Sequence, residues 1–126
     1  MIIWKNTKNY IPYKNPIKFF RLTHIQKKYD EHNMNLNKNN ISIYEHIMNN
    51  IIKDNMMIIV KNNFPYYIPG FKHYLIWFNP VYKINYKEVY EYIDLKMKNK
   101  NYLYFENEDN NKSVLKIRHF HIFVKN

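Results

Sequence analysis

Hydrophobic and polar residues alternate over residues 117–126, and the apolar ones are β-branched or aromatic. This pattern predicts a β-strand, whose successive side chains point to opposite faces of a sheet. One face carries Ile117, His119, His121 and Phe123, and the other carries Arg118, Phe120, Ile122 and Val124. Two imidazoles therefore lie side by side on an otherwise apolar strand, and a third, His73, opens another strand-like run.

Three helices are indicated by capping signals followed by apolar residues at helical spacing. The first is expected to end near His32, because the Asn-rich residues 33–40 are typical of a loop. The second carries an apolar stripe of Ile43, Ile47 and Ile51. The capping pairs are Thr23 with Gln26, Ser42 with Glu45, and Asn85 with Glu88.

Short apolar runs predict the other strands, at residues 56–60, 73–78 and 102–105. This order of helices and strands favours an α+β fold, in which helices cover an antiparallel sheet. The 126 residues fit a single domain with one core. We expect residues 1–18 to form an N-terminal arm and residues 19–126 to form the domain.

Asn, Ile, Lys and Tyr dominate the composition, and their AT-rich codons indicate the genome of an AT-rich microbe or a large DNA virus. The net charge of +10 would favour a polyanionic partner. However, 18 Lys and only two Arg supply the positive charge, and scattered Lys is typical of a solvated surface. The charge therefore suits a phosphorylated small ligand, with nucleic acid as the less favoured partner.

The composition also excludes several classes of site. Without Cys the chain has neither disulfides nor thiolate chemistry, and a single glycine, Gly70, excludes Gly-rich phosphate loops. No run reaches the roughly 18 apolar residues of a membrane helix, and the apolar start is too short for a signal peptide. We expect an intracellular, cytoplasmic protein without membrane contact, placed in the host cytoplasm if the gene is viral.

Three interpretations of His73, His119 and His121 are open. They could satisfy buried hydrogen bonds in an aromatic-rich sheet, since an isolated His-x-His pair is a weak signal. They could also give zinc three imidazole ligands and leave one position open. The zinc site lacks an acidic residue close to either strand in sequence, which the second shell of such sites usually needs.

The third interpretation is phosphoryl or nucleotidyl chemistry, which requires neither a metal nor a cofactor. A neutral imidazole can attack phosphorus and form a covalent intermediate, while a neighbouring imidazole donates to a phosphate oxygen or to the leaving group. The polar loop that leads into the last strand would then bind phosphate oxygens, through Asn107, Lys112 and Ser113.

Two segments resemble a known family. One signature of the fungal N-acetylglucosamine-induced proteins is similar to residues 64–66 (FPY) and 70–77 (GFKHYLIW). The second signature of that family is similar to residues 105–107 (FEN), 112–114 (KSV) and 119–124 (HFHIFV). The similarity covers roughly residues 19–125, and the function of that family is uncharacterised.

A more distant resemblance is to the core of the histidine triad nucleotide hydrolases and transferases, which end in a His-φ-His-φ-His-φ-φ strand, where φ is apolar. The resemblance implies that His119 is the nucleophile, His121 the last triad histidine and His73 the histidine of the earlier strand, with Ser113 in the phosphate loop. Ile117 occupies the place of the first triad histidine. Weak catalysis, or binding alone, is therefore compatible with the resemblance.

Together these features predict a protein with a histidine-triad-like core that binds a nucleotide or another phosphorylated small molecule and hydrolyses or transfers it. His119 would be the nucleophile, His121 a proton donor or phosphate ligand, and His73 a supporting imidazole. The alternative is a non-catalytic module on the same fold that binds a protein or nucleic acid. A homodimer is compatible with both.

Overall fold

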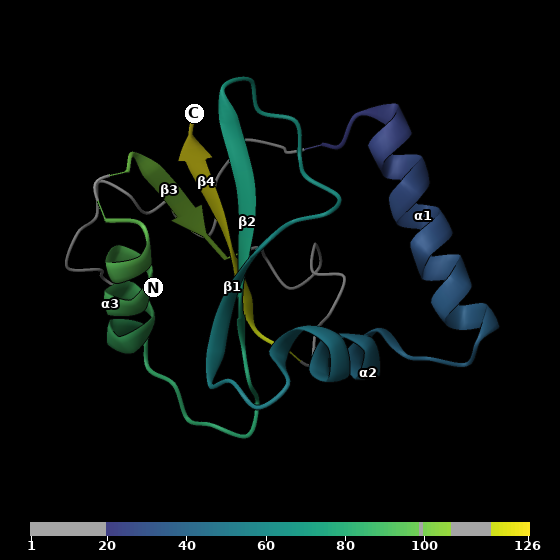
Figure 1. The fold of residues 1–126 in the computed structure, drawn as a ribbon, viewed down its shortest axis with the longest axis horizontal. Coiled ribbons are helices and arrows are strands. Elements are labelled where there is room, and N and C mark those ends of the chain that lie inside the picture. The colour runs from purple at the N-terminus through teal and green to yellow at the C-terminus, as the bar shows by residue number, and fades with distance from the viewer. Residues whose placement is uncertain (1–19, 99, 107–116) are drawn as a thin grey trace.

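The computed structural model describes residues 20–98, 100–106 and 117–126. Its strands form one sheet in the order β1-β2-β4-β3, in which every neighbouring pair is antiparallel (Figure 1). The helices are α1 (Thr23–Lys38), α2 (Ile43–Ile47), the π-helix η2 (Met48–Ile52) and α3 (Tyr86–Lys96). The strands are β1 (Met57–Lys61), β2 (Phe71–Phe78), β3 (Tyr102–Phe105) and β4 (His119–Lys125).

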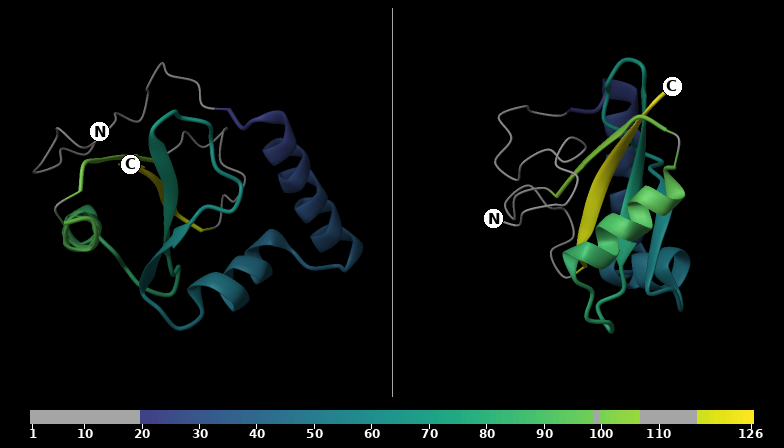
Figure 2. Two further views of the ribbon diagram at one scale, coloured as in Figure 1. Left: turned by 45° about the horizontal axis from the view of Figure 1, so that its top comes forward. Right: turned by 90° about the vertical axis from the view of Figure 1, so that its left-hand side faces the viewer.

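The predicted α+β fold with an antiparallel sheet is confirmed. The helices lie on both sides of the sheet, with α3 against one face and α1 and α2 on the other side (Figures 1 and 2). The predicted arm, residues 1–18, lies outside the described residues. Within the described part of the chain, no helix has both the length and the apolar character needed to cross a membrane.

The face of the sheet under α3 contains the larger hydrophobic core. Alternate residues of β4 point to this face, as the sequence pattern predicted, and pack against the apolar side of α3. Asn85 caps α3 as expected, since its side chain accepts a hydrogen bond from the backbone N–H of Glu88 (2.8 Å). The fully buried residues of this core include Ile76, Val89, Ile93, Tyr104, Phe120 and Ile122.

The opposite face of the sheet packs against α2 and η2. Ser42 caps α2 as predicted, by accepting from the backbone N–H of Glu45 (3.0 Å). The helix then widens into a π-helix, whose hydrogen bonds join residues five apart. Ile47 and Ile52 are consequently the residues buried against Trp77 and Ile117, whereas Ile51 of the predicted stripe is only partly buried.

The first helix begins at Thr23, as the sequence predicted, but the predicted capping box and the predicted end near His32 were wrong. Its N-cap is Leu22, without a side-chain hydrogen bond, so Thr23 forms no capping box. The helix continues through the Asn-rich segment to Lys38, because Leu36 is buried in its last turn. It ends in a Schellman motif, in which Asn40 adopts a φ of 57° and the N–H of Ile41 donates to the carbonyl of Leu36 (2.9 Å).

Ile93 provides a test of the core beneath α3. Replacing this fully buried side chain with alanine is expected to lower the free energy of unfolding by about 2–5 kcal/mol, because apolar contacts are lost and a cavity remains. Leu95 lies on the same helix and is 68% exposed, so Leu95→Ala should change stability by no more than about 0.5 kcal/mol. Urea unfolding measures both variants, and equal losses would contradict this packing of α3.

Candidate functional site

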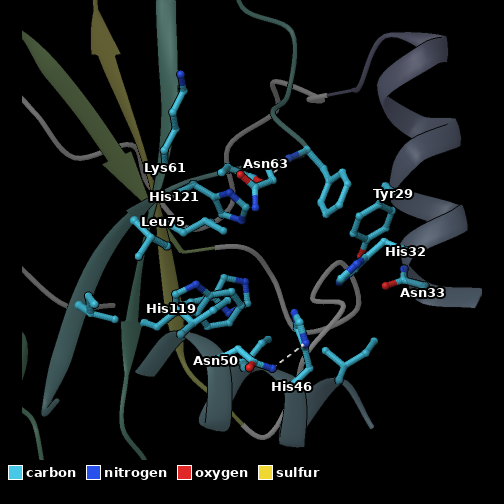
Figure 3. A pocket seen from close by; sticks show the side chains of 18 of the residues that line it. Tyr29, His32, Asn33, His46, Asn50, Lys61, Asn63, Leu75, His119 and His121 are labelled. Carbon is cyan, nitrogen blue, oxygen red and sulfur yellow. Dashed lines mark hydrogen bonds between the residues drawn. The ribbon is translucent and has the colours of Figure 1, made fainter. Parts of the chain in front are cut away.

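A cavity of about 490 Å³ lies between the histidine-bearing face of the sheet and the helices on that side. Figure 3 shows His119 and His121 on the sheet side, His46 and Asn50 on α2 and η2, and Tyr29 and His32 on α1, across the cavity. The loop between β1 and β2 forms another part of the wall, with Asn62, Asn63, Phe64 and Tyr66 among the lining residues.

A chain of hydrogen bonds connects the loop to two of the histidines. The backbone N–H of Tyr66 donates to Nδ1 of His73 (3.0 Å), and Nε2 of His73 lies 2.8 Å from Nδ1 of His121. Because a backbone N–H is always a donor, Nδ1 of His73 is unprotonated and the neutral ring carries its proton on Nε2. His73 therefore donates to His121, and neutral His121 carries its own proton on Nε2.

Both of these imidazoles are held in the neutral form. Burial is the main cause that lowers the pKa of His73 to about 3, and the charge of Arg21 and the neighbouring imidazole of His119 act in the same direction. Burial and the interactions with His73, His119 and Arg21 lower the pKa of His121 well below its usual value. At neutral pH His121 is thus a hydrogen-bond donor through Nε2, and its lowered pKa means that it is not protonated to the imidazolium form.

His119 has the opposite tautomer. Its Nδ1 lies 3.2 Å from the carbonyl oxygen of Ile117, which can only accept a hydrogen bond. Nδ1 therefore carries the proton, and the lone pair of the neutral ring is on Nε2. Trp77 packs against the imidazole with a ring-centroid distance of 4.5 Å, and it pairs with His119 across the sheet. Backbone and indole together fix the orientation of this ring.

An ion pair on the other face of the sheet anchors the start of β4. Arg118 lies 3.3 Å from the buried carboxylate of Glu106 and also donates to the hydroxyl of Tyr86. The carbonyl of Arg118 accepts from the backbone N–H of Phe78 (3.0 Å), which joins β4 to β2 at this point. These contacts immediately precede His119, so they determine where the strand places its imidazole.

Arg21 supplies a positive charge to the cavity. Its Nε–H donates to the carbonyl of Phe64 (2.7 Å), and its guanidinium carbon lies 4.0 Å from the ring centroid of Tyr29 and 4.9 Å from that of Tyr66. None of the ion pairs between described residues involves Arg21. Two aromatic rings and one carbonyl therefore position this guanidinium, and no carboxylate of a described residue neutralises it.

The charges around the cavity have one sign. Arg21, Lys53 and Lys61 line it, and no Asp or Glu is among the described lining residues. Four imidazoles, those of His32, His46, His119 and His121, and the phenols of Tyr29 and Tyr66 also line it. Such a surface favours an anionic ligand, because no carboxylate among the described lining residues competes for the cations.

The structure brings together the three histidines predicted from the sequence. His73, His119 and His121 are buried on one face of two adjacent strands, and the ring centroids of His119 and His121 are 5.5 Å apart. The loop residues predicted to contact phosphate, Asn107, Lys112 and Ser113, lie outside the described residues. Their predicted role stays a prediction.

Several cavity residues were missed. His32 and His46 were not among the predicted site residues, yet their rings are in edge-to-face contact (4.9 Å) and line the cavity. Arg21 carried a usable signal, as one of only two Arg in a chain rich in Lys. Lys53 and Lys61 carried none, because many other lysines have similar sequence surroundings.

The zinc interpretation finds no ligand set in the described part of the chain. There, no group of three or more His, Cys, Asp or Glu side chains is arranged to hold a metal ion. The nearest imidazoles, those of His73 and His121, direct ring nitrogens at each other in a hydrogen bond.

The buried imidazoles predict a dependence of stability on pH. Below pH 6.5 the unfolded chain binds a proton at His73 that the folded protein does not bind until about pH 3, so the free energy of unfolding falls as the pH drops through this window. At pH 5 the loss attributable to His73 is about 2 kcal/mol. Urea unfolding between pH 7.5 and 5.0 measures it.

Two variants isolate the contribution of His73. His73→Gln should reduce the number of protons taken up on unfolding at pH 5 by about one, and so flatten the pH dependence. His24 is exposed and lies outside the hydrogen-bond chain, so His24→Gln should leave the slope unchanged. An unchanged slope in His73→Gln would contradict a neutral buried His73.

Comparisons with known proteins add evidence on the fold. No protein-family profile matches the sequence, and no curated protein matches it. The crystal structure of HTC1 has a similar fold, with a TM-score of 0.50 and 20% sequence identity over 84% of this chain and 75% of that chain. At this identity the similarity concerns the fold alone, so it supports the α+β architecture and leaves the histidine-triad-like core a prediction.

Proposed function

We propose that the cavity binds a nucleotide or another phosphorylated small molecule, and that His119 attacks its phosphorus atom. The observation that carries this proposal is the composition of the cavity wall. Three cations and a tautomerically fixed imidazole face the same space, and no carboxylate is among the described lining residues. An anionic substrate is attracted to such a wall, and a nucleophile that carries no negative charge can approach it.

The tautomer of His119 suits nucleophilic attack. The lone pair of Nε2 would form the bond to phosphorus while the bond from phosphorus to the leaving oxygen breaks, and the oxygen departs with that electron pair. The imidazole then carries a positive charge, which the hydrogen bond from Nδ1–H to the carbonyl of Ile117 stabilises. Water, or another acceptor, would attack the phosphorus in a second step, lose its proton and release neutral His119.

His121 fits the role of a phosphate ligand better than that of an acid. Its lowered pKa leaves it neutral, with a donor at Nε2 and with Nδ1 occupied by the hydrogen bond from His73. A neutral donor can bind a phosphate oxygen and stabilise the charge that develops there. His73 would act as a positioning residue, because it holds the tautomer of His121 and is itself bonded to the backbone of Tyr66.

Aromatic side chains line the cavity in addition to the cations, and this favours a nucleotide over inorganic phosphate. Tyr29, Phe64, Tyr66 and Trp77 line it, and flat apolar rings are suited to stack on a nucleobase. The indole N–H of Trp77 is buried and has no hydrogen-bond partner among the described residues. A mixed aromatic and cationic wall is typical of sites that bind a base and its phosphate together.

The departure from the triad pattern supports a site assembled from two strands. Ile117 packs in the core beside Trp77, so the position of the first triad histidine serves packing in this chain. His73 enters from β2 instead and lies directly against His121. In this proposal the protein has a histidine-triad-like core whose third imidazole comes from the neighbouring strand.

Turnover of a substrate panel tests the catalytic part of the proposal. Adenylates, guanylates, dinucleoside polyphosphates, cap analogues and nucleotide sugars are incubated with native protein and His119→Asn, and products are identified by mass spectrometry. We expect His119→Asn to lose at least about 1000-fold in turnover, because the lone pair that attacks phosphorus is removed. His24→Gln is the matched control and should retain full activity.

Two outcomes would change this conclusion. Equal turnover by native protein and His119→Asn would exclude His119 as the nucleophile. Nucleotide binding without turnover by either folded protein would leave a binding module without the chemistry. Salt-sensitive binding of RNA that survives His119→Ala would instead favour the alternative of a nucleic-acid-binding protein.

Arg21 tests the binding part of the proposal separately. Arg21→Gln should weaken the affinity for AMP by roughly 10- to 100-fold, because a charge-assisted contact to phosphate is lost. Arg21→Lys should restore part of the affinity, since it retains the charge but not the planar fork. Calorimetric titration measures the affinities, and thermal unfolding checks that the loop held by the Phe64 carbonyl is intact. Equal affinity in all three proteins would contradict a phosphate site at Arg21.

A further inference from the structure

The indole of Trp77 lies against the imidazole of His119. The two residues pair across β2 and β4, and their ring centroids are 4.5 Å apart with an interplanar angle of 35°. At this distance and tilt the imidazole lies over the face of the indole, since rings placed edge to edge would be farther apart. Both side chains are buried, and both line the cavity. The face of an aromatic ring attracts a cation, and among the aromatic side chains Trp attracts it most strongly.

Apolar packing holds the indole in this place. Trp77 belongs to the small core cluster on this side of the sheet, together with Ile47, Ile52 and Ile117. Its N–H has no hydrogen-bond partner among the described residues, so packing and strand pairing set the orientation of the ring. A group that is already fixed in position stabilises a developing charge without reorganising, and this is the property that electrostatic catalysis requires.

The other two histidines of the site lie against different rings. His73 stacks on Phe123 with a centroid distance of 4.5 Å, and His121 stacks on Phe105 with a centroid distance of 5.0 Å. A phenyl ring attracts a cation less strongly than an indole does. The lowered pKa of each of these two imidazoles keeps them neutral. The indole therefore lies beside the one imidazole that would become charged in the proposed reaction.

The cations of the cavity oppose the charge that the proposed reaction creates on His119. Its Nε2 forms a bond to phosphorus, the leaving oxygen departs with the electron pair of the broken bond, and the imidazole becomes positive. Arg21, Lys53 and Lys61 line the same cavity, and their field disfavours a further cation. The carbonyl of Ile117 offsets part of this effect through Nδ1–H. An indole face offsets a further part, and unlike a carboxylate it does not repel an anionic ligand.

We propose that Trp77 stabilises the positive charge of His119 in the covalent intermediate by a cation–π interaction. This inference rests on the proposed function, because it requires that His119 attacks phosphorus. Trp77 acts through His119 and is therefore a positioning residue. The charge is present only once attack has begun, so the interaction lowers the barrier to formation of the intermediate and does not accelerate its hydrolysis.

Fluorinated tryptophans test this interaction with little change in the shape of the side chain, because each fluorine withdraws electron density from the ring face. A nonsense codon at position 77 of the whole chain introduces 5-fluoro-, 5,7-difluoro- or 5,6,7-trifluorotryptophan, and ordinary tryptophan inserted by the same route is the matched control. The probe is the p-nitrophenyl ester of thymidine 5′-monophosphate. Release of p-nitrophenolate in a single turnover measures attack by His119, and mass spectrometry of the isolated nucleotidyl-protein measures hydrolysis.

The rate of attack should fall with each added fluorine, by roughly 3- to 10-fold for the trifluorinated protein. Hydrolysis of the isolated adduct should not become slower, and the melting temperature should stay the same. A disturbed orientation of His119 would instead slow both steps, and this outcome would contradict a cation–π role.

The same measurements separate this inference from the proposed function. If the adduct forms on His119 and its rate of formation does not respond to fluorine, the role of Trp77 is wrong while the proposed function stands. If the control protein releases no more p-nitrophenolate than His119→Asn, attack by His119 is excluded and this inference fails with it.

Discussion

Two backbone groups determine the chemistry of the three buried histidines. The N–H of Tyr66 can only donate, and this obliges His73 to carry its proton on the nitrogen that faces His121. The carbonyl of Ile117 can only accept, and this obliges His119 to carry its proton on Nδ1. Main-chain geometry thus does what carboxylates do in many other histidine sites. Neighbouring imidazoles consequently differ in function, with a donor at Nε2 of His121 and a lone pair at Nε2 of His119.

The two faces of the sheet differ in polarity, and this difference lets the fold remain stable with three buried histidines. The face under α3 buries Ile76, Ile93 and Ile122 completely and supplies most of the apolar core, so the other face can carry polar groups. There α2 and η2 bury only a small cluster around Trp77. The buried imidazoles remain tolerable because those of His73 and His121 bond each other and His119 bonds the backbone. An apolar layer on one side of the sheet thus supports a polar site on the other.

Much of this fold could be predicted from the sequence, because the relevant signals are local. Alternation along residues 117–126 predicted which face carries His119 and His121, and Asn85 marked the start of α3. The end of α1 was missed because its Asn residues favour a loop, whereas burial of Leu36 extends the helix. Arg21 and Lys53 line the cavity only because of the tertiary fold, and local sequence patterns do not predict such positions. Sequence therefore found the sheet side of the site and missed its helical side.

The charge of Arg21 affects both the ligand preference of the cavity and the protonation of the histidines. Arg21 lies among aromatic rings, and no ion pair between described residues involves it, so its field attracts an anion. Burial is the main cause of the lowered pKa of His73 and His121, and the charge of Arg21 adds to it. A carboxylate beside Arg21 would weaken both effects, because it would neutralise the field and favour imidazolium. The absence of acidic residues from the described cavity wall therefore contributes to two properties. It leaves the cations available to an anionic ligand, and together with burial it favours the neutral forms of His73 and His121.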